Sequence, residues 1–226
     1  MITAVLFDLF ETLITESWAQ PTRASHLAPT LGLERDAYRK EFKMRRPSIV
    51  RGQMSLAEAL TDIAQTLRGG ADQAAIQGIC QQRIREKAVA YAQIHDGVAA
   101  LVTTLARRGV GLAVISNGFE EDVLGWSHCS LAAEIRCTAF SCLEGIAKPD
   151  PEIYRRALLR LGVDPATTVY IGDGGDDELA GAAGAGLRAH RAAWFVRNSP
   201  QKAATWPELT DPKDVLNPVV NGRDDR

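Results

Sequence analysis

Near the N-terminus, a short apolar run from Ala4 to Phe7 ends in a single carboxylate, Asp8, and a turn follows it. A short uninterrupted apolar run is typical of a parallel strand that is buried on both faces. Ligands of α/β proteins bind at the carboxyl ends of such strands. The run therefore predicts a parallel sheet with Asp8 at its functional edge. The structural alternative is that Asp8 only caps the following turn, because Asp is a common helix cap.

Further apolar runs alternate with helical patterns from residue 98 onward. The expected strands after the first are Leu112–Ile115, Cys137–Phe140, Thr168–Ile171, Leu187–Ala192 and Trp206–Leu209. The helices expected between them are Val98–Arg108, Glu120–Trp126, Pro151–Leu161 and Asp177–Ala185. This alternation predicts an α/β fold with a doubly wound parallel sheet.

The stretch from about Thr22 to Ala92 has no strand signal and has a helical pattern. Pro47 is expected to mark a loop in this stretch. Ser55 followed by Glu58 is a capping box, and the helix that it starts is expected to run from Leu56 to Leu67. We therefore expect a helical cap domain inserted after the first strand. The expected division is a core of residues 1–16 and 95–226 and a cap of residues 17–94.

The composition limits the classes of partner. With 46% hydrophobic and 24% charged residues, the 226-residue chain is typical of a soluble globular protein with one α/β domain and a small accessory domain. The formal net charge of −2 gives no reason to expect nucleic acid or an anionic membrane as a partner. No signal peptide and no apolar run long enough to cross a bilayer is recognised, so a cytoplasmic location is expected.

Three later stretches place polar residues at the ends of expected elements. Ser116 and Asn117 follow an expected strand, Lys148 lies in a loop just before a helix, and Gly172-Asp173 is followed by the acids Asp176-Asp177-Glu178. Together with Asp8, these stretches resemble the four ordered motifs of the haloacid dehalogenase superfamily. The resemblance covers nearly the whole chain and is closest to members with a helical cap. It implies a Rossmann-like core and a hydrolase.

In that family, Asp8 would be the nucleophile and would form an aspartyl-phosphate, which divides one difficult step into two. Mg²⁺ would supply positive charge, because it binds a few carboxylates together with water and phosphate oxygens. The resemblance implies Asp8 and Asp173 as carboxylate ligands and the backbone carbonyl of Phe10 as a third ligand. The cofactor expected is therefore Mg²⁺.

The other motif residues would hold the transferred group. The resemblance implies that Lys148 pairs with the phosphate and the nucleophile. Ser116 would bind phosphoryl oxygens through its hydroxyl, and Asn117 would bind them through backbone N–H groups. Thr12 matches the family's motif position. Each of these residues also has a plain structural alternative, as a turn residue or a solvated loop lysine.

The second acid of the last motif is ambiguous from the sequence. Asp177 fits the shorter spacing of the family pattern and Glu178 fits the longer one, which the following Leu179-Ala180-Gly181-Ala182 favours. Asp176 or Asp177 would then cap the next helix. In the cap, Arg45, Arg46 and Arg51 lie in and beside the expected central loop, and Arg51 is a candidate substrate ligand.

One position departs from the phosphatase pattern. Phosphatases of this family usually carry Asp two residues after the nucleophile, where it protonates the leaving group. Here that residue is Phe10, which cannot transfer a proton and can only line the substrate site. The adjacent Glu11 is expected to point elsewhere, because neighbours on an extended segment face opposite ways.

Three hypotheses follow. The leading one is a Mg²⁺-dependent phosphatase that acts on a small phosphorylated metabolite, as a monomer or homodimer. The first alternative is a metal-independent hydrolase of the L-2-haloacid dehalogenase type, because dehalogenases carry an aromatic residue at the position of Phe10. The second alternative is a catalytically impaired binding protein. Asp173 and its acidic neighbours favour the phosphatase, because a Mg²⁺ site needs such carboxylates.

Overall fold

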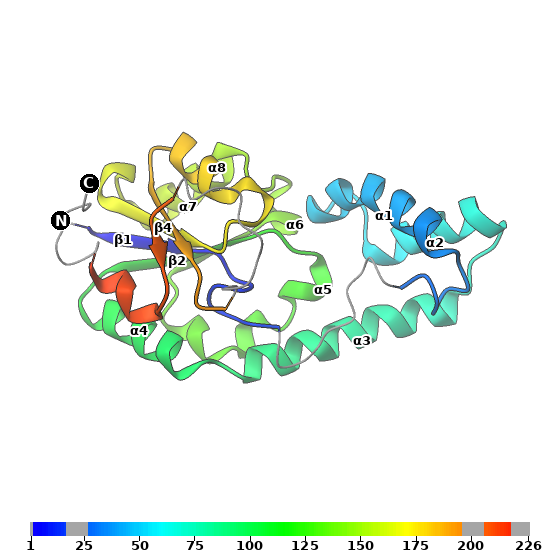
Figure 1. Cartoon of the computed structure of the whole chain (residues 1–226), viewed down its shortest axis with the longest axis horizontal. Helices are drawn as coiled ribbons and strands as arrows, with labels where there is room; N and C mark the ends of the chain where they lie inside the picture. Colours follow the sequence, from blue (N-terminus) through cyan, green and yellow to red (C-terminus); the bar gives the residue numbers. More distant parts are fainter. Residues whose placement is uncertain (1, 17–26, 196–205, 218–226) are drawn as a thin grey trace.

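A computed structural model of the chain describes residues 2–16, 27–195 and 206–217. Its centre is a six-stranded sheet of order β3-β2-β1-β4-β5-β6, in which every neighbouring pair is parallel (Figure 1). The strands are β1 (Ala4–Phe7), β2 (Gly111–Ser116), β3 (Cys137–Phe140), β4 (Thr168–Gly172), β5 (Arg188–Ala192) and β6 (Glu208–Leu209). The predicted α/β fold with a parallel sheet is confirmed.

Strand β1 is the structural centre of the sheet. Its four residues are fully buried, and Phe7 is in register with Val114 of β2 and Ile171 of β4. The Asp8 amide continues this pairing by donating to the carbonyl of Ile171 at 2.8 Å. The residues that follow β1, β2 and β4 therefore leave the sheet at one common edge.

Helices cover both faces of the sheet, as Figure 1 shows. Val5 and Phe7 pack on the face covered by α4 (Asp96–Arg107), while Leu6 packs on the face covered by α7 (Pro151–Leu161) and α8 (Glu178–Gly184). The short α-helices α5 (Glu120–Val123) and α6 (Ser141–Glu144) follow β2 and β3. The 3₁₀ turns are η2 (Trp126–His128), η3 (Ser130–Ala133), η4 (Pro165–Thr167), η5 (Gly175–Asp177) and η6 (Pro212–Val215).

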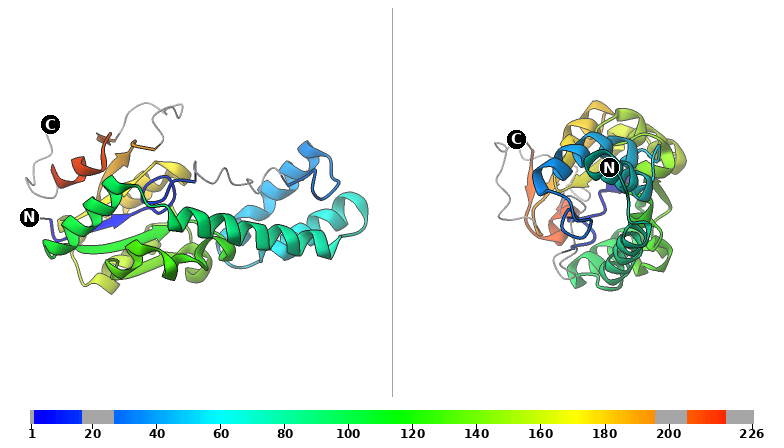
Figure 2. Two further views of the ribbon diagram at one scale, coloured as in Figure 1. Left: turned by 90° about the horizontal axis from the view of Figure 1, so that it is seen from below. Right: turned by 90° about the vertical axis from the view of Figure 1, so that its right-hand side faces the viewer.

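Among the described residues between β1 and α4, three helices follow one another: α1 (Arg35–Val50), α2 (Leu56–Arg68) and α3 (Gln73–Ala92). Figures 1 and 2 show α1 and α2 beyond one end of the sheet, with α3 extending from there along the core. We call α1–α3 the cap helices. They share an apolar cluster of their own, which Phe119 and Ala147 join from the core.

The expected capping box of Ser55 and Glu58 at the start of α2 is present. The domain boundaries stay a prediction, because residues 17–26 lie outside the described part of the chain. No helix of the described residues is long and apolar enough to span a membrane.

Two local predictions were wrong. Pro47 does not open a loop but lies in the last turn of α1, where its missing N–H costs one helical bond. The helix continues because Ile49 and Val50 are buried against the other cap helices. The helix expected to reach Trp126 ends at Val123 and gives way to a 3₁₀ turn.

Candidate active site

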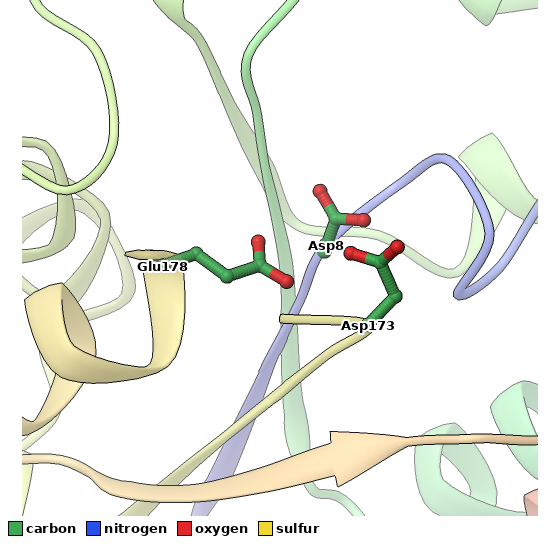
Figure 3. A group of neighbouring side chains, drawn as sticks. All are labelled: Asp8, Asp173 and Glu178. Carbon is green, nitrogen blue, oxygen red and sulfur yellow. The ribbon is translucent and has the colours of Figure 1, made fainter. Parts of the chain in front are cut away.

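Three carboxylates converge beyond the carboxyl ends of β1 and β4 (Figure 3). Asp8 directly follows β1, Asp173 directly follows β4, and Glu178 begins α8. One oxygen atom from each lies within 4.8 Å of the others. Asp8 and Glu178 are buried, and Asp173 is half-buried. The sheet register explains this meeting, because β1 and β4 are paired neighbours.

Lys148 provides the positive charge of this cluster. Its ammonium donates to Asp8 Oδ1, to Glu178 Oε2 at 2.5 Å and to the Tyr170 hydroxyl at 3.3 Å. Burial alone would lower the pKa of Lys148, but Asp8 and Glu178 outweigh it and hold that pKa well above the ordinary value. The side chain therefore stays protonated.

The carboxylates carry more negative charge than Lys148 balances. Burial, and then repulsion from Glu178, raise the pKa of Asp8 to about 8, although Lys148 opposes the shift. The same two causes raise the pKa of Asp173 to about 6. A buried group of like charges with raised pKa values is the electrostatic condition that a divalent cation relieves. The oxygen-only donor set fits Mg²⁺, which prefers carboxylates and water.

Two buried hydroxyl groups are available for a ligand. Ser116 ends β2 with 1% of its surface exposed, and Thr12 lies in the turn after β1 and is fully buried. Within the described part of the chain, neither hydroxyl has a hydrogen-bond partner. An unpartnered buried hydroxyl costs about 1–3 kcal/mol, and an oxyanion bound there would satisfy it.

Asn117 uses its side-chain amide within the protein. Oδ1 accepts from the Lys148 amide at 2.8 Å, while Nδ2 donates to the Lys148 carbonyl at 3.0 Å and to Asp176 Oδ2 at 2.9 Å. The side chain thus fixes the backbone of Lys148. Substrate binding by backbone N–H groups near Asn117 stays a prediction.

Phe10 and Glu11 lie in the turn that follows Asp8. The Phe10 ring is half-buried, and the Lys87 ammonium of α3 lies over it. Glu11 adopts a left-handed conformation with φ of 59°, and its carboxylate accepts from Thr15 Oγ1 at 3.1 Å and from the Glu16 amide at 2.9 Å. Glu11 therefore closes the turn, in agreement with the expectation that its side chain points elsewhere.

The geometry distinguishes the acids of the last motif. Glu178 is 1% exposed, and its Oε1 accepts from the Gly174 amide at 3.0 Å. Gly172 makes room for it, since a Cβ there would lie 2.1 Å from Glu178 Oε1. Asp177 is exposed, with φ of 54°, and lies outside the three-carboxylate cluster. Asp176 instead accepts from Asn117.

The cap arginines have separate partners. Arg45 and Arg46 lie near the end of α1, and Arg51 directly follows that helix. Arg45 pairs with Glu41 and Asp62 inside the cap, and Arg51 donates to the Pro47 carbonyl at 3.1 Å. Arg46 reaches the core and donates to Asp176 Oδ2 at 3.0 Å. The sequence analysis singled out Arg51, whereas Arg46 contacts the turn that carries the acids.

Sequence reasoning missed two tyrosines beside the cluster. The Tyr170 hydroxyl donates to Glu178 Oε2 at 2.7 Å, and the Tyr154 hydroxyl donates to the Glu178 carbonyl at 2.7 Å. A Tyr in an otherwise aliphatic strand was the available signal for Tyr170, because a buried phenol usually has a polar partner. Burial raises the pKa of Tyr170 well above its ordinary value, so its hydroxyl keeps the proton.

The sequence model of the haloacid dehalogenase-like hydrolase family matches residues 2–186. A phosphoserine phosphatase of Thermus thermophilus is 31% identical over 143 residues, which cover 58% of this chain and 55% of that protein. The chain therefore spans about half the length of that relative. A glyceraldehyde 3-phosphate phosphatase of Methanopyrus kandleri is 26% identical over 83% of this chain and 82% of its own length.

Among solved structures, the fold resembles a 2-haloacid dehalogenase of Pseudomonas syringae pv. Tomato, with a TM-score of 0.71. The match covers 99% of this chain and 100% of that chain, with 23% sequence identity. A likeness at this level of identity supports the fold.

Proposed function

The chain belongs to the haloacid dehalogenase-like hydrolase family and is an enzyme, and we propose that it is a Mg²⁺-dependent phosphatase. The proposed substrate is a small phosphorylated metabolite, and the proposed nucleophile is Asp8. The observation that carries the proposal is the convergence of Asp8, Asp173 and Glu178 around one buried ammonium, that of Lys148. Two phosphatases of small metabolites among the relatives support it.

In the proposed reaction, a carboxylate oxygen of Asp8 attacks phosphorus. An Asp8–phosphorus bond forms as the bond from phosphorus to the leaving oxygen breaks, and that oxygen takes the electron pair. Lys148 places positive charge where negative charge redistributes. Water then attacks phosphorus, the Asp8–phosphorus bond breaks, and inorganic phosphate leaves.

The residues that would hold Mg²⁺ are Asp8 and Asp173, with the Phe10 carbonyl as the family resemblance implies. Glu178 would act beside them, because its Oε1 keeps capacity to accept from a metal-bound water. When bound, the ion would neutralise the phosphate and the nucleophile so that two anions can meet. The unpartnered hydroxyls of Thr12 and Ser116 would donate to the other phosphoryl oxygens.

Phe10 narrows the proposed substrate class. A leaving alkoxide needs a proton in the transition state, and neither Phe10 nor the occupied carboxylate of Glu11 supplies one. The enzyme should therefore prefer acyl or aryl phosphates, whose leaving groups depart without a proton. We also propose that the cap comprises residues 17–94, with the core formed by residues 1–16 and 95–226.

A second candidate is a dehalogenase in which Asp8 attacks carbon. Phe10 favours it, because halide leaves without a proton. Asp173 argues against it, because a metal-independent reaction has no need for a third carboxylate next to Asp8 and Glu178.

The test compares wild type with Asp8→Asn on acetyl phosphate and p-nitrophenyl phosphate, with Mg²⁺ or with EDTA. We expect Mg²⁺-dependent turnover that Asp8→Asn abolishes, while Asp36→Asn on the exposed start of α1 retains it. Full activity of Asp8→Asn would refute the proposal. Halide release from 2-chloropropionate in EDTA, without phosphate turnover, would support the dehalogenase.

A further inference from the structure

Tyr170 lies in the fourth strand, directly beneath the cluster of charged side chains. It is fully buried, and its ring packs edge-on against Tyr154 with 5.2 Å between ring centres. Its hydroxyl donates to Glu178 Oε2 at 2.7 Å and accepts from Lys148 Nζ at 3.3 Å. A single phenol therefore contacts both a carboxylate and the ammonium of the site.

These contacts complete the hydrogen bonding of Lys148. A protonated lysine has three N–H donors, and burial leaves each of them dependent on a protein acceptor. Within the described residues, the three acceptors are Asp8, Glu178 and the Tyr170 hydroxyl. Removal of the hydroxyl would leave one N–H without its partner.

The Tyr170 hydroxyl also completes the hydrogen bonding of the Glu178 carboxylate. Its Oε2 receives Lys148 and Tyr170, and its Oε1 receives the Gly174 amide. With donors on both oxygens, the carboxylate has one orientation. Without the phenol, the remaining donor to Oε2 in the described part of the chain would be Lys148, which Asp8 also attracts.

We propose that Tyr170 is a positioning residue that holds Glu178 and Lys148 in the arrangement required for reaction at Asp8. This role rests on the proposed function. The hydroxyl does not touch the reacting atoms. It limits how far the Lys148 ammonium can move toward Asp8, and it keeps Glu178 Oε1 directed away from Lys148. Loss of such an outer hydrogen bond lowers turnover more than substrate affinity, because the charges are misplaced when the transition state forms.

Tyr154 provides the matched control. It is also fully buried, shares the ring contact, and donates to Glu178 at the same distance of 2.7 Å. Its acceptor is the backbone carbonyl of Glu178 rather than the carboxylate. Tyr154→Phe therefore removes a comparable hydrogen bond but leaves the hold on the carboxylate intact.

The first measurement is steady-state turnover of acetyl phosphate with saturating Mg²⁺. We expect kcat of Tyr170→Phe to fall about 10–100-fold with little change in KM, as for other residues that orient a metal ligand. Tyr154→Phe should keep kcat within about threefold of wild type, because its lost partner is the Glu178 backbone carbonyl and the hydrogen bonds to the Glu178 carboxylate remain. Equal losses in both variants, or none in Tyr170→Phe, would overturn the proposal.

A second measurement does not depend on turnover. A double-mutant cycle combines Tyr170→Phe with Glu178→Met, which removes both carboxylate oxygens, and follows urea unfolding. We expect a coupling of about fivefold in the unfolding equilibrium constant, as for groups in direct contact. The Tyr154→Phe cycle with Glu178→Met should be additive within about twofold.

The two measurements distinguish failure of the proposed function from failure of the proposed role of Tyr170. If wild type hydrolyses neither acetyl phosphate nor p-nitrophenyl phosphate, the proposed function fails, and the cycle alone decides whether Tyr170 holds Glu178. An additive Tyr170–Glu178 cycle overturns the positioning role whatever the activity.

Discussion

The Lys87 ammonium lies 3.5 Å from the centre of the Phe10 ring, and only 4% of the Lys87 surface is exposed. Lys87 is held by ion pairs to Glu16 and, at 3.6 Å, to Asp122. Phe10 occupies the position where phosphatases of the family usually carry an aspartate. A buried positive charge behind this ring is compatible with an aromatic face, which attracts cations.

Replacement of Lys87 by Met should destabilise the protein. The change leaves Asp122 with Arg83 as its remaining cation and removes the cation of Glu16. Loss of one partner from a buried ion pair costs about 3 kcal/mol, which urea unfolding would measure. The exposed Lys40→Met should change the free energy of unfolding by less than about 0.5 kcal/mol. An unchanged free energy of unfolding in Lys87→Met would show that the buried ion pairs contribute nothing to stability.

The sequence predicted those parts of the site that depend on local signals. Asp8 and Asp173 each end an apolar run, and parallel pairing of the two strands brings them together. From the sequence, Glu178 was favoured over Asp177 only by the spacing of the motif and the residues that follow it. The structural reason for Glu178 lies in Gly172, whose missing side chain admits the carboxylate. This reason depends on three-dimensional contact and is not visible from spacing.

Other contacts depend on how distant elements pack. Lys87 lies on a polar stretch of α3, and nothing in its spacing indicates that it meets Phe10, 77 positions earlier. Arg46 lies near the end of α1, and its guanidinium pairs with Asp176, which lies 130 positions later in the chain. The sequence analysis therefore did not predict these contacts between distant segments.

Replacement of Arg46 by Met should raise KM with little effect on stability. The Arg46–Asp176 pair links α1 to the acidic turn, but both side chains are substantially exposed, so the free energy of unfolding should change by less than about 1 kcal/mol. Without the link, the cap would close over the substrate less often. Steady-state kinetics on acetyl phosphate would measure KM. Arg45→Met, which loses only pairs inside the cap, should keep the wild-type KM.

Glu144 should contribute a stability that acid removes. Hydrogen bonds from Arg160 and then Arg156 hold the pKa of Glu144 below its ordinary value. Because the folded pKa is lower than the unfolded pKa of about 4.3, the contribution is present above that pH and is lost as pH falls through the folded pKa. Glu144→Gln should therefore be less stable than wild type by about 1 kcal/mol at pH 7.

The difference between wild type and Glu144→Gln should shrink below about pH 4.3 in urea unfolding at a series of pH values. The exposed Glu134→Gln should show no such trend. A difference that is constant with pH would contradict the assigned pKa direction.

The substitution Phe10→Asp should not provide a general acid unless Lys87 is also changed. The introduced carboxylate of Phe10→Asp would lie beside the Lys87 ammonium, which favours the ionised form and so removes the proton that a general acid must donate. We therefore expect Phe10→Asp alone to gain nothing on ethyl phosphate relative to p-nitrophenyl phosphate. Phe10→Asp combined with Lys87→Gln, whose amide can still donate to Glu16, should raise that activity ratio about 100-fold. A comparable gain in the single variant would show that Lys87 does not control the protonation of residue 10.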